Sequence, residues 1–160
     1  MAVADMIGAA VGVILLVIVA YLLVGSVLST SQVVTNAQKS AFLLEEKQLK
    51  TNFYISSVNY TAGNLNCSIT NDGNEPISDF SHMDVIVLYN DPKQDQIYLY
   101  STTGSPGTWT ILNPMVNPIH PYELDPNDTF NIQVVLTNSD TPARIQINSA
   151  NAVTTSTNIP

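Results

Sequence analysis

The chain has 160 residues, a net charge of −8 from 13 acidic and 5 basic residues, and a single cysteine, Cys67. One cysteine excludes an intramolecular disulfide and a cluster of thiolate metal ligands. Residues 51–160 keep only Lys93 and Arg144 against ten acidic residues, which excludes nucleic acid as a partner, because affinity for phosphate backbones comes from basic side chains.

An unbroken apolar segment covers residues 6–28, and no charged residue occurs between Asp5 and Lys39. As a helix rising 1.5 Å per residue, about 23 residues span about 34 Å, which is enough to cross a bilayer core of about 30 Å. Gly8 and Gly12 form a G-x-x-x-G pair, a spacing that lets a second helix approach closely. The segment therefore predicts a membrane-compatible helix that can also pack against other helices.

The residues before this segment contain no lysine or arginine, whereas a secretory signal begins with a basic region. Two interpretations stay open: an uncleaved membrane anchor, or a mature chain whose short basic leader was removed just before Met1. Asp5 would be costly inside lipid unless it were neutralised, but near a helix N-terminus at the water boundary its charge is favourable. We therefore expect Asp5 to act as a helix cap or as an inter-subunit charge.

Beyond Ser31 the helical pattern continues to about Lys50, but it becomes amphipathic, with one apolar stripe at helical spacing. A continuous helix of about 45 residues would be about 68 Å long, twice what a bilayer requires. The outer half must therefore bury its stripe against its own head or against neighbouring subunits. The residues that we expect to pack in a core of like helices are Ile7, Gly8, Val11, Gly12, Ile14, Leu15, Ile18, Leu22, Val33, Ala37, Ala41 and Leu44.

From Asn52 the pattern changes to short alternating strands, separated by turn residues at intervals of about ten residues. The segment Met83–Tyr89 predicts a central strand that is apolar on both faces. Turn signals occur at Asn71–Asn74 and at Gly104–Gly107. The further predicted strands lie within residues 53–58, 65–69, 97–100, 109–112, 130–136 and 143–147.

The segment from Asn113 to Pro126 contains four prolines and is expected to be an extended crossover rather than regular structure. About seven short antiparallel strands in about 100 residues are typical of an immunoglobulin-like β-sandwich. The predicted class is therefore α+β. Residues 1–50 are predicted to form the hydrophobic assembly or transmembrane helix with its amphipathic stalk, and residues 51–160 the β-sandwich head.

Three N-x-[ST] sequons, at Asn59, Asn66 and Asn127, favour an extracellular position of the head and are candidate sites of N-glycosylation. Motifs for catalysis are missing, since the sequence has no G-x-S-x-G elbow, no phosphate loop and no H-E-x-x-H. The two histidines, His82 and His120, lie beside turn-rich sequence, and the acidic loops do not match EF-hand spacing. We expect no enzyme activity, no cofactor and no metal site.

The layout resembles the archaeal flagellin (archaellin) superfamily and archaeal type IV pilin-like proteins. The likeness is carried by the unbroken apolar helix, its amphipathic continuation at Thr35–Ser40, the exit at Lys50–Asn52, and the segment Ser68–Ile77 that leads to the strand Met83–Val87. The helix lacks the Gly-Ile-Gly-Thr-Leu opening that is common in archaellins.

This resemblance implies a structural subunit of an extracellular filament, an archaellum or an adhesive pilus, that polymerises with identical subunits through its N-terminal helix. The helix would lie in the membrane before assembly and move into a core of like helices on assembly. The alternative is a singly membrane-anchored accessory or stator protein of the archaellum whose sandwich binds the surface layer. In either case a surface-layer protein or an external surface is a further candidate partner of the head.

Overall fold

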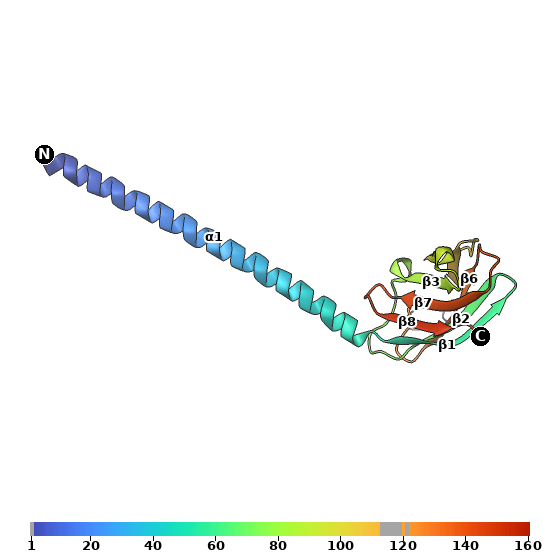
Figure 1. Cartoon of the computed structure of the whole chain (residues 1–160). Helices are drawn as coiled ribbons and strands as arrows, with labels where there is room; N and C mark the ends of the chain where they lie inside the picture. The colour runs from blue at the N-terminus through green and yellow to red at the C-terminus, as the bar shows by residue number, and fades with distance from the viewer. Residues whose placement is uncertain (1, 113–119, 121) are drawn as a thin grey trace. The chain divides into compact units, whose positions relative to one another are not determined.

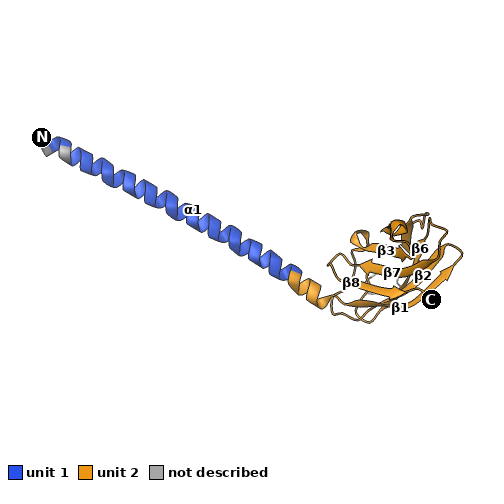
Figure 2. Ribbon diagram, in the orientation of Figure 1, with its two compact units in different colours: residues 1–44 blue, residues 45–160 orange. Residues whose placement is uncertain are grey.

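A long helix, α1 (Ala2–Lys50), forms the N-terminal part of the computed structural model (Figure 1). The structure describes residues 2–112, 120 and 122–160, without the side chains of Ala2 and Asp5. The chain divides into two compact units, Met1–Leu44 and Glu45–Pro160 (Figure 2). The last turns of α1 therefore belong to the same unit as the strands. The predicted boundary after residue 50, between an assembly helix and a head, stays a prediction.

The sequence of α1 contains no proline, the residue that breaks a helix most strongly. Hydroxyl groups in its middle are satisfied within the helix, because Thr30 Oγ1 donates to the Ser26 carbonyl oxygen at 2.9 Å. Thr35 Oγ1 donates in the same way to the Ser31 carbonyl oxygen, also at 2.9 Å. These hydroxyls already have acceptors within the helix and need no hydrogen bond to water or to another chain. This part of α1 can therefore enter an apolar environment.

Eight strands and two short 3-10 helices follow α1 in the described chain. A two-residue turn joins the first two strands, and its residues Ala62 and Gly63 both have positive φ, 47° and 83°, as a type I′ hairpin requires. In chain order the elements are β1 (Phe53–Thr61), β2 (Asn64–Asn71), η1 (Phe80–His82), β3 (Asp84–Tyr89), η2 (Pro92–Gln94), β4 (Gln96–Tyr100), β5 (Thr108–Ile111), β6 (Thr129–Val135), β7 (Pro142–Asn148) and β8 (Thr154–Asn158).

The strands follow the order β1-β2-β6-β5-β4-β3-β7-β8 and fold into two layers of a nearly closed sandwich (Figure 1). The strands β1, β2, β6 and β5 make one layer, and β3, β7 and β8 make the other. β4 joins the layers, because Ile97 pairs with Ile86 of β3 whereas Tyr100 pairs with Trp109 of β5. The edge strand β8 lies close to β1. The predicted α+β class with a helix followed by an antiparallel sandwich is confirmed.

The core lies between the two layers. Every second residue is buried on β2, β3 and β6, which is the alternation expected of strands with one face on a core. Trp109 and Tyr98 are the largest fully buried side chains. Phe80 of η1 closes the core with its ring edge against Phe130, at 5.6 Å between ring centroids.

Two features of the sandwich were not anticipated. β8 has the sequence Thr-Thr-Ser-Thr-Asn without an apolar residue, so hydrophobic alternation could not reveal it, yet it pairs along β7 through the backbone. β4 and β5, on either side of the predicted turn at Gly104–Gly107, pair in parallel. Most of the predicted crossover, residues 113–119 and 121, lies outside the described residues. Near its end, Leu124 forms a bridge with Ile77.

The single cysteine, Cys67, lies in β2 and is 2% exposed. Burial raises the pKa of its thiol from 9.0 to about 12. Because the thiolate is the reactive form, we expect the folded protein to resist a maleimide at about pH 8 and to react only on unfolding. Mass spectrometry measures the labelling, and rapid labelling of the folded protein would contradict this burial.

The same shift predicts a pH dependence of stability. The folded-state pKa of Cys67 lies above the ordinary value of 9.0. The contribution of the buried neutral thiol to the free energy of unfolding is therefore fully present below pH 9 and is lost as pH rises toward about 12. The expected loss is at most about 1.4 kcal/mol per pH unit in this window. Urea unfolding above pH 9 should show a shallower pH dependence for Cys67→Ala than for the wild type.

Candidate functional site

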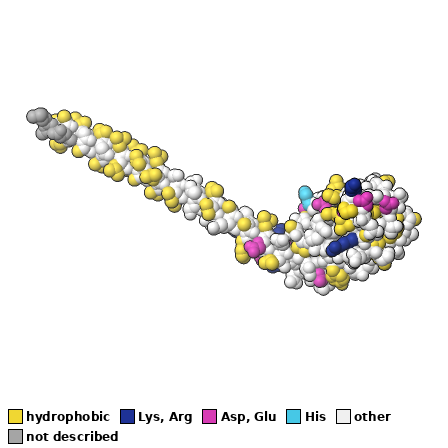
Figure 3. All heavy atoms as spheres, in the orientation of Figure 1, with side chains coloured by type: hydrophobic (Ala, Val, Ile, Leu, Met, Phe, Trp, Pro, Cys, Tyr) yellow, Lys and Arg dark blue, Asp and Glu magenta, His cyan; other side chains and the backbone are white. Residues whose placement is uncertain are grey.

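The surface of α1 is apolar on all sides over residues 6–28 and is exposed in the described chain (Figure 3). By length and composition this helix can cross a membrane, a test that signal sequences and buried core helices also pass. A helix that is apolar all round needs apolar surroundings on every side. Lipid supplies such surroundings, and so does a bundle of like helices.

The residues predicted to pack in a core of like helices all lie on α1 and are exposed. Ile7 is 60% exposed and Ile18 is 49% exposed. A Cβ atom added at Gly8 or Gly12 would meet nothing within 4 Å, so this side of α1 is open to a second helix. The packing role of these residues stays a prediction, as does the role of Asp5, whose side chain lies outside the described part of the chain.

The exposed apolar surface continues beyond the length that a bilayer needs. If about 23 residues ending near Leu28 cross the hydrocarbon core, the apolar side chains that follow lie outside it. Among these, Val33 and Phe42 are each 65% exposed and Leu44 is 68% exposed. Burial of such surface is favourable by about 25 cal/mol per Å². This second apolar region therefore favours contact with protein rather than with lipid.

The C-terminal end of α1 is held by the loop that follows β2. The Lys50 carbonyl oxygen accepts hydrogen bonds from the backbone N–H of Asn74 at 2.8 Å and of Glu75 at 3.2 Å. The Gly73 N–H donates to the Asn52 carbonyl oxygen at 2.9 Å. Since the last carbonyl groups of a helix have no partner within the helix, this loop supplies the missing donors. We call residues 47–52 and 71–75 together the helix-end anchor.

Asn71 organises the loop of the anchor. Its side chain is fully buried, and its Nδ2 donates to the carbonyl oxygens of Glu75 at 2.9 Å and Leu124 at 2.8 Å. Its Oδ1 accepts from the Gly73 N–H at 3.0 Å. One buried amide thus fixes three backbone groups of two loops.

We expect Asn71→Ala to lower the free energy of unfolding of the head by about 3 kcal/mol, because it leaves buried backbone groups without partners. Asn71→Asp keeps the acceptor for Gly73 but loses both donors and buries a charge, so it should cost at least as much. The measurement is thermal unfolding of the full chain in detergent. Asn90→Ala, at an exposed asparagine, is the matched control, and an equal effect of both alanine variants would contradict this role of Asn71.

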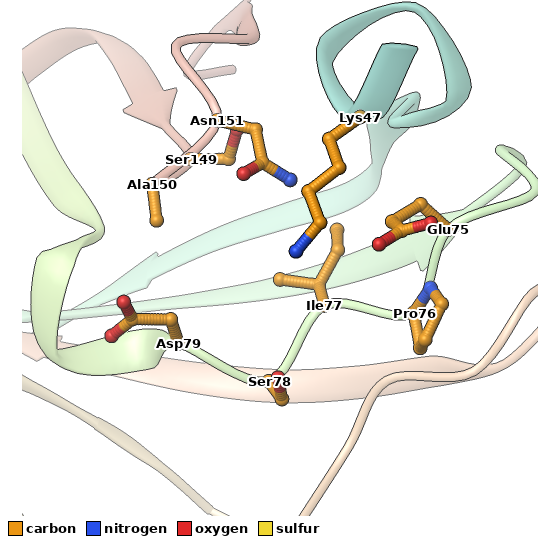
Figure 4. A pocket seen from close by; sticks show the side chains of 9 residues that line it. All are labelled: Lys47, Glu75, Pro76, Ile77, Ser78, Asp79, Ser149, Ala150 and Asn151. Carbon is orange, nitrogen blue, oxygen red and sulfur yellow. The ribbon is translucent and has the colours of Figure 1, made fainter. Parts of the chain in front are cut away.

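A second loop also contacts the helix end. Thr51 is 4% exposed, and its Oγ1 donates to the Lys47 carbonyl oxygen at 2.8 Å while accepting from Asn151 Nδ2 at 2.9 Å. A pocket of about 240 Å³ adjoins this contact. In Figure 4 the Lys47 side chain extends between Glu75 and Asp79. No acidic group lies within ion-pair distance of Lys47 in the described chain.

His82 does not form a catalytic arrangement with its neighbours in the described chain. His82 Nδ1 lies 2.8 Å from Asp79, and this hydrogen bond, with a further one from Ser81, lowers the pKa of the Asp79 carboxyl. Ser81 Oγ and Asp79 both approach Nδ1 of the ring, whereas a nucleophile and an orienting carboxylate must contact opposite ring nitrogens. The arrangement is a local, exposed turn of η1.

A second histidine belongs to a small polar cluster. The ligand atoms of His120, Glu123 and Asp125 all lie within 4.8 Å of one another, and His120 Nδ1 lies 3.1 Å from Asp125 Oδ2. Exposed acidic groups commonly gather in this way without an ion. The expectation of no metal site stays a prediction.

The three sequons lie in different surroundings. Asn59 on β1 and Asn127 in the loop before β6 are exposed. Asn66 on β2 is half-buried between two neighbouring strands, and its Oδ1 accepts from Gln133 Nε2 at 3.3 Å. An enzyme that attaches a glycan needs access to the amide, which Asn59 and Asn127 offer.

The helix-end anchor was not identified from the sequence, although its loop was predicted as a turn. The available signal was the spacing Asn71-Asp72-Gly73, in which the asparagine side chain can bond to the backbone two residues on. The part that involves Lys50 and Asn52 depends on tertiary proximity and leaves no local pattern.

Comparison with known proteins bears on this helix and head together. A family model described as archaeal-type flagellin matches residues 4–159. No curated protein matches the sequence.

Solved structures were compared as well. The archaellum periplasmic stator protein FlaG from Sulfolobus acidocaldarius is similar with a TM-score of 0.53 and 24% identity, over 68% of this chain and 99% of that chain. The FlaF and FlaG stator complex from the same organism gives a TM-score of 0.52 and 23% identity, over 67% of this chain and 87% of that chain. At these identities the two matches show a shared fold.

Proposed function

Because this chain belongs to the archaeal-type flagellin family, we propose that it is a structural subunit of an extracellular, type IV pilus-like filament, either an archaellum or an adhesive pilus. Its partners in this role are identical subunits, which polymerise through α1 into a helical homopolymer. The protein acts by packing and has no enzyme activity.

The observation that carries this proposal is the exposed apolar surface of α1 beyond Leu28. A single anchor needs apolar residues only along the bilayer. Here Val33, Phe42 and Leu44 add exposed apolar surface further along the helix. A bundle of like helices would cover this surface together with the membrane-length part.

Assembly would exchange lipid contacts for contacts with other helices. Residues 6–28 have apolar surroundings both in lipid and among other helices, so the transfer need not expose them to water. Gly8 and Gly12 leave room for close approach. All of the net charge lies in residues 45–160, where four basic residues stand against 12 acidic ones (4 − 12 = −8), so the helix enters a core without a net charge while the heads stay in solvent.

The second candidate is a singly anchored accessory or stator protein. The fold of the head favours it, because the solved archaellum protein FlaG, named a periplasmic stator protein, shares that fold. The same apolar helix would then remain in the membrane, and the head would bind a surface-layer protein.

Shearing of cells separates the two candidates. A filament subunit should be released as a polymer with helical order, and its N-terminal mass should identify the processed end. A stator should stay in the membrane fraction as a monomer or small oligomer after the same treatment. Recovery of the chain only in membranes, with no polymer in the sheared fraction, would overturn the filament proposal.

We further propose that Asn59 and Asn127 carry glycans and that Asn66 does not. Chymotryptic peptides of protein from its native cells should show mass additions at the first two sites. Thr61→Val and Thr129→Val should each remove one addition, because they destroy the sequon and leave the asparagine in place. A modified Asn66 would contradict the argument from burial.

A further inference from the structure

One layer of the sandwich has an outer face without charge. The strands β1, β2, β5 and β6 contain no acidic or basic residue, although the chain has 13 acidic and 5 basic residues. Outward positions on strands commonly carry charged side chains, which keep a sheet soluble and separate from other sheets. We call the outward amides and hydroxyls of this layer the neutral face: Ser57, Asn59, Asn66, Ser68, Thr70, Thr110, Thr129, Asn131 and Gln133.

Hydrogen bonds join the side chains of the neutral face across three strands. Ser57 Oγ donates to Ser68 Oγ at 2.9 Å, and Ser68 Oγ donates to Asn131 Oδ1 at 2.7 Å. In the next row Gln133 Nε2 donates to Asn66 Oδ1 at 3.3 Å. Within the described chain the Nδ2 groups of Asn66 and Asn131 make no hydrogen bond. The neutral face is therefore an ordered array of polar groups that keeps donors for a further partner.

The exposed sequon residue Asn59 lies on this face. It pairs with Asn66 in the sheet, and its neighbours Val58 and Tyr60 pack against the core, so the Asn59 side chain points outward. β1 is an edge strand, so β2 and then β6 lie on one side of it. A glycan attached to Asn59 would consequently begin in the row that Asn59 forms with Asn66 and Gln133.

The chemistry of the neutral face fits an oligosaccharide better than a lipid or a protein. An anionic lipid headgroup needs basic side chains, which these four strands do not contain. A protein interface needs aromatic, aliphatic or arginine anchors at its centre. Sugar hydroxyls both donate and accept hydrogen bonds, and the amides and hydroxyls of the neutral face do the same.

Tyr54 adjoins the far end of the neutral face. It pairs with Thr70 in the sheet and is 46% exposed. The Thr70 row lies four residues from the Asn66 row along β2, which is about 13 Å. An aromatic ring offers the C–H groups of a sugar an apolar surface, so Tyr54 is suited to contact the outer part of a glycan that starts at Asn59.

We propose that the glycan on Asn59 lies along the neutral face, over Ser68 and Asn131 and toward Tyr54. This inference rests on the proposed glycosylation of Asn59 and is independent of the choice between filament and stator. The glycan then supplies the hydrated surface that charged side chains supply on other sheets.

The test uses the oxidation of Tyr54 by hydroxyl radicals in the full chain, purified from its native cells in detergent and analysed by mass spectrometry. Thr61→Val and Asn59→Gln each remove the glycan in a different way. Both should raise the oxidation rate of Tyr54 about fivefold, the factor that one net hydrogen bond corresponds to. Tyr122, which is 72% exposed, is the internal control and should oxidise at the same rate in every sample.

A variant of the face itself separates contact from mere attachment. Asn131→Ala keeps the sequon at Asn59 but removes an amide of the neutral face, so the oxidation rate of Tyr54 should rise about threefold while the mass addition at Asn59 remains. In a Thr61→Val background the same substitution should have no effect on Tyr54. Gln146→Ala, at a half-buried amide on β7 in the other layer, is the matched control and should leave the rate unchanged. Protection of the Cys67 thiol reports folding in each variant.

The possible results separate this inference from the proposals on which it depends. Equal oxidation of Tyr54 with and without the Asn59 glycan would overturn the inference and leave the glycosylation standing. An unmodified Asn59 would overturn both and would leave the filament proposal to the shearing experiment. A rate that rises in Thr61→Val but not in Asn131→Ala would show a glycan that shields Tyr54 without lying on the neutral face, which would also overturn the inference.

Discussion

A chain with Ala37→Asp and Ala41→Asp is expected to insert into membranes as the wild type does, but to lose filament assembly almost completely. Both positions lie on the apolar stripe of α1 beyond Leu28, outside the membrane-length segment of residues 6–28. Insertion therefore involves neither new charge. In a core of like helices both carboxylates would be buried without partners, at several kcal/mol per ion.

The yield of sheared polymer should consequently fall by at least about 100-fold, which corresponds to about 2.7 kcal/mol. The matched control is Gln32→Asp with Thr35→Asp, which adds the same charge on the opposite side of the helix. If the stripe faces like helices and the opposite side does not, the control should retain most of its polymer. Wild-type yield from the stripe variant would contradict the filament proposal and favour the stator.

Gly73→Ala is expected to destabilise the head strongly. A Cβ atom at this position would lie 2.4 Å from the Asn52 backbone nitrogen and 2.5 Å from the Lys50 carbonyl oxygen. Both neighbours are backbone atoms, so neither can move aside without shifting the helix end or the loop. The added methyl group also separates the Gly73 N–H from the Asn52 carbonyl oxygen that it reaches at 2.9 Å.

We expect a loss of about 3 kcal/mol of unfolding free energy and a decrease in Tm of about 10 °C, measured by thermal unfolding of the full chain in detergent. Gly63→Asn is the matched control. Gly63 has a φ of 83° with nothing within 4 Å of an added Cβ, and asparagine tolerates this conformation. A larger decrease in Tm for Gly63→Asn than for Gly73→Ala would show that close packing at the anchor is not the cause.

The elements that follow from a pattern of neighbouring residues in the sequence were predicted well. The helix follows from an apolar segment and a stripe at helical spacing, and the structure begins it at Ala2 rather than at Met6. Strands with one buried face, such as β2 with Leu65, Cys67 and Ile69 inward, follow from alternation, because side chains on a strand point to opposite faces in turn.

Features that depend on tertiary contact were not predicted. β8 consists of polar residues that fit an edge strand held by backbone pairing with β7. The apolar outer residues of β3 predicted a strand covered on both faces, whereas the described sandwich covers only one face of this strand. Gly73 was recognised as a turn residue, but its closeness to Lys50 and Asn52 arises only when the loop folds against the end of the helix.

The helix-end anchor also has a consequence for how such a head can vary. Its groups facing Lys50 and Asn52 are backbone N–H groups of residues 73–75, which every residue type except proline supplies. Side-chain identity matters in this loop at two positions. Asn71 holds the conformation of the loop, and Gly73 leaves room for the backbone of Lys50 and Asn52. The rest of the head can therefore diverge in sequence while the helix-end anchor is kept, so that the same helix can carry heads with many different surfaces.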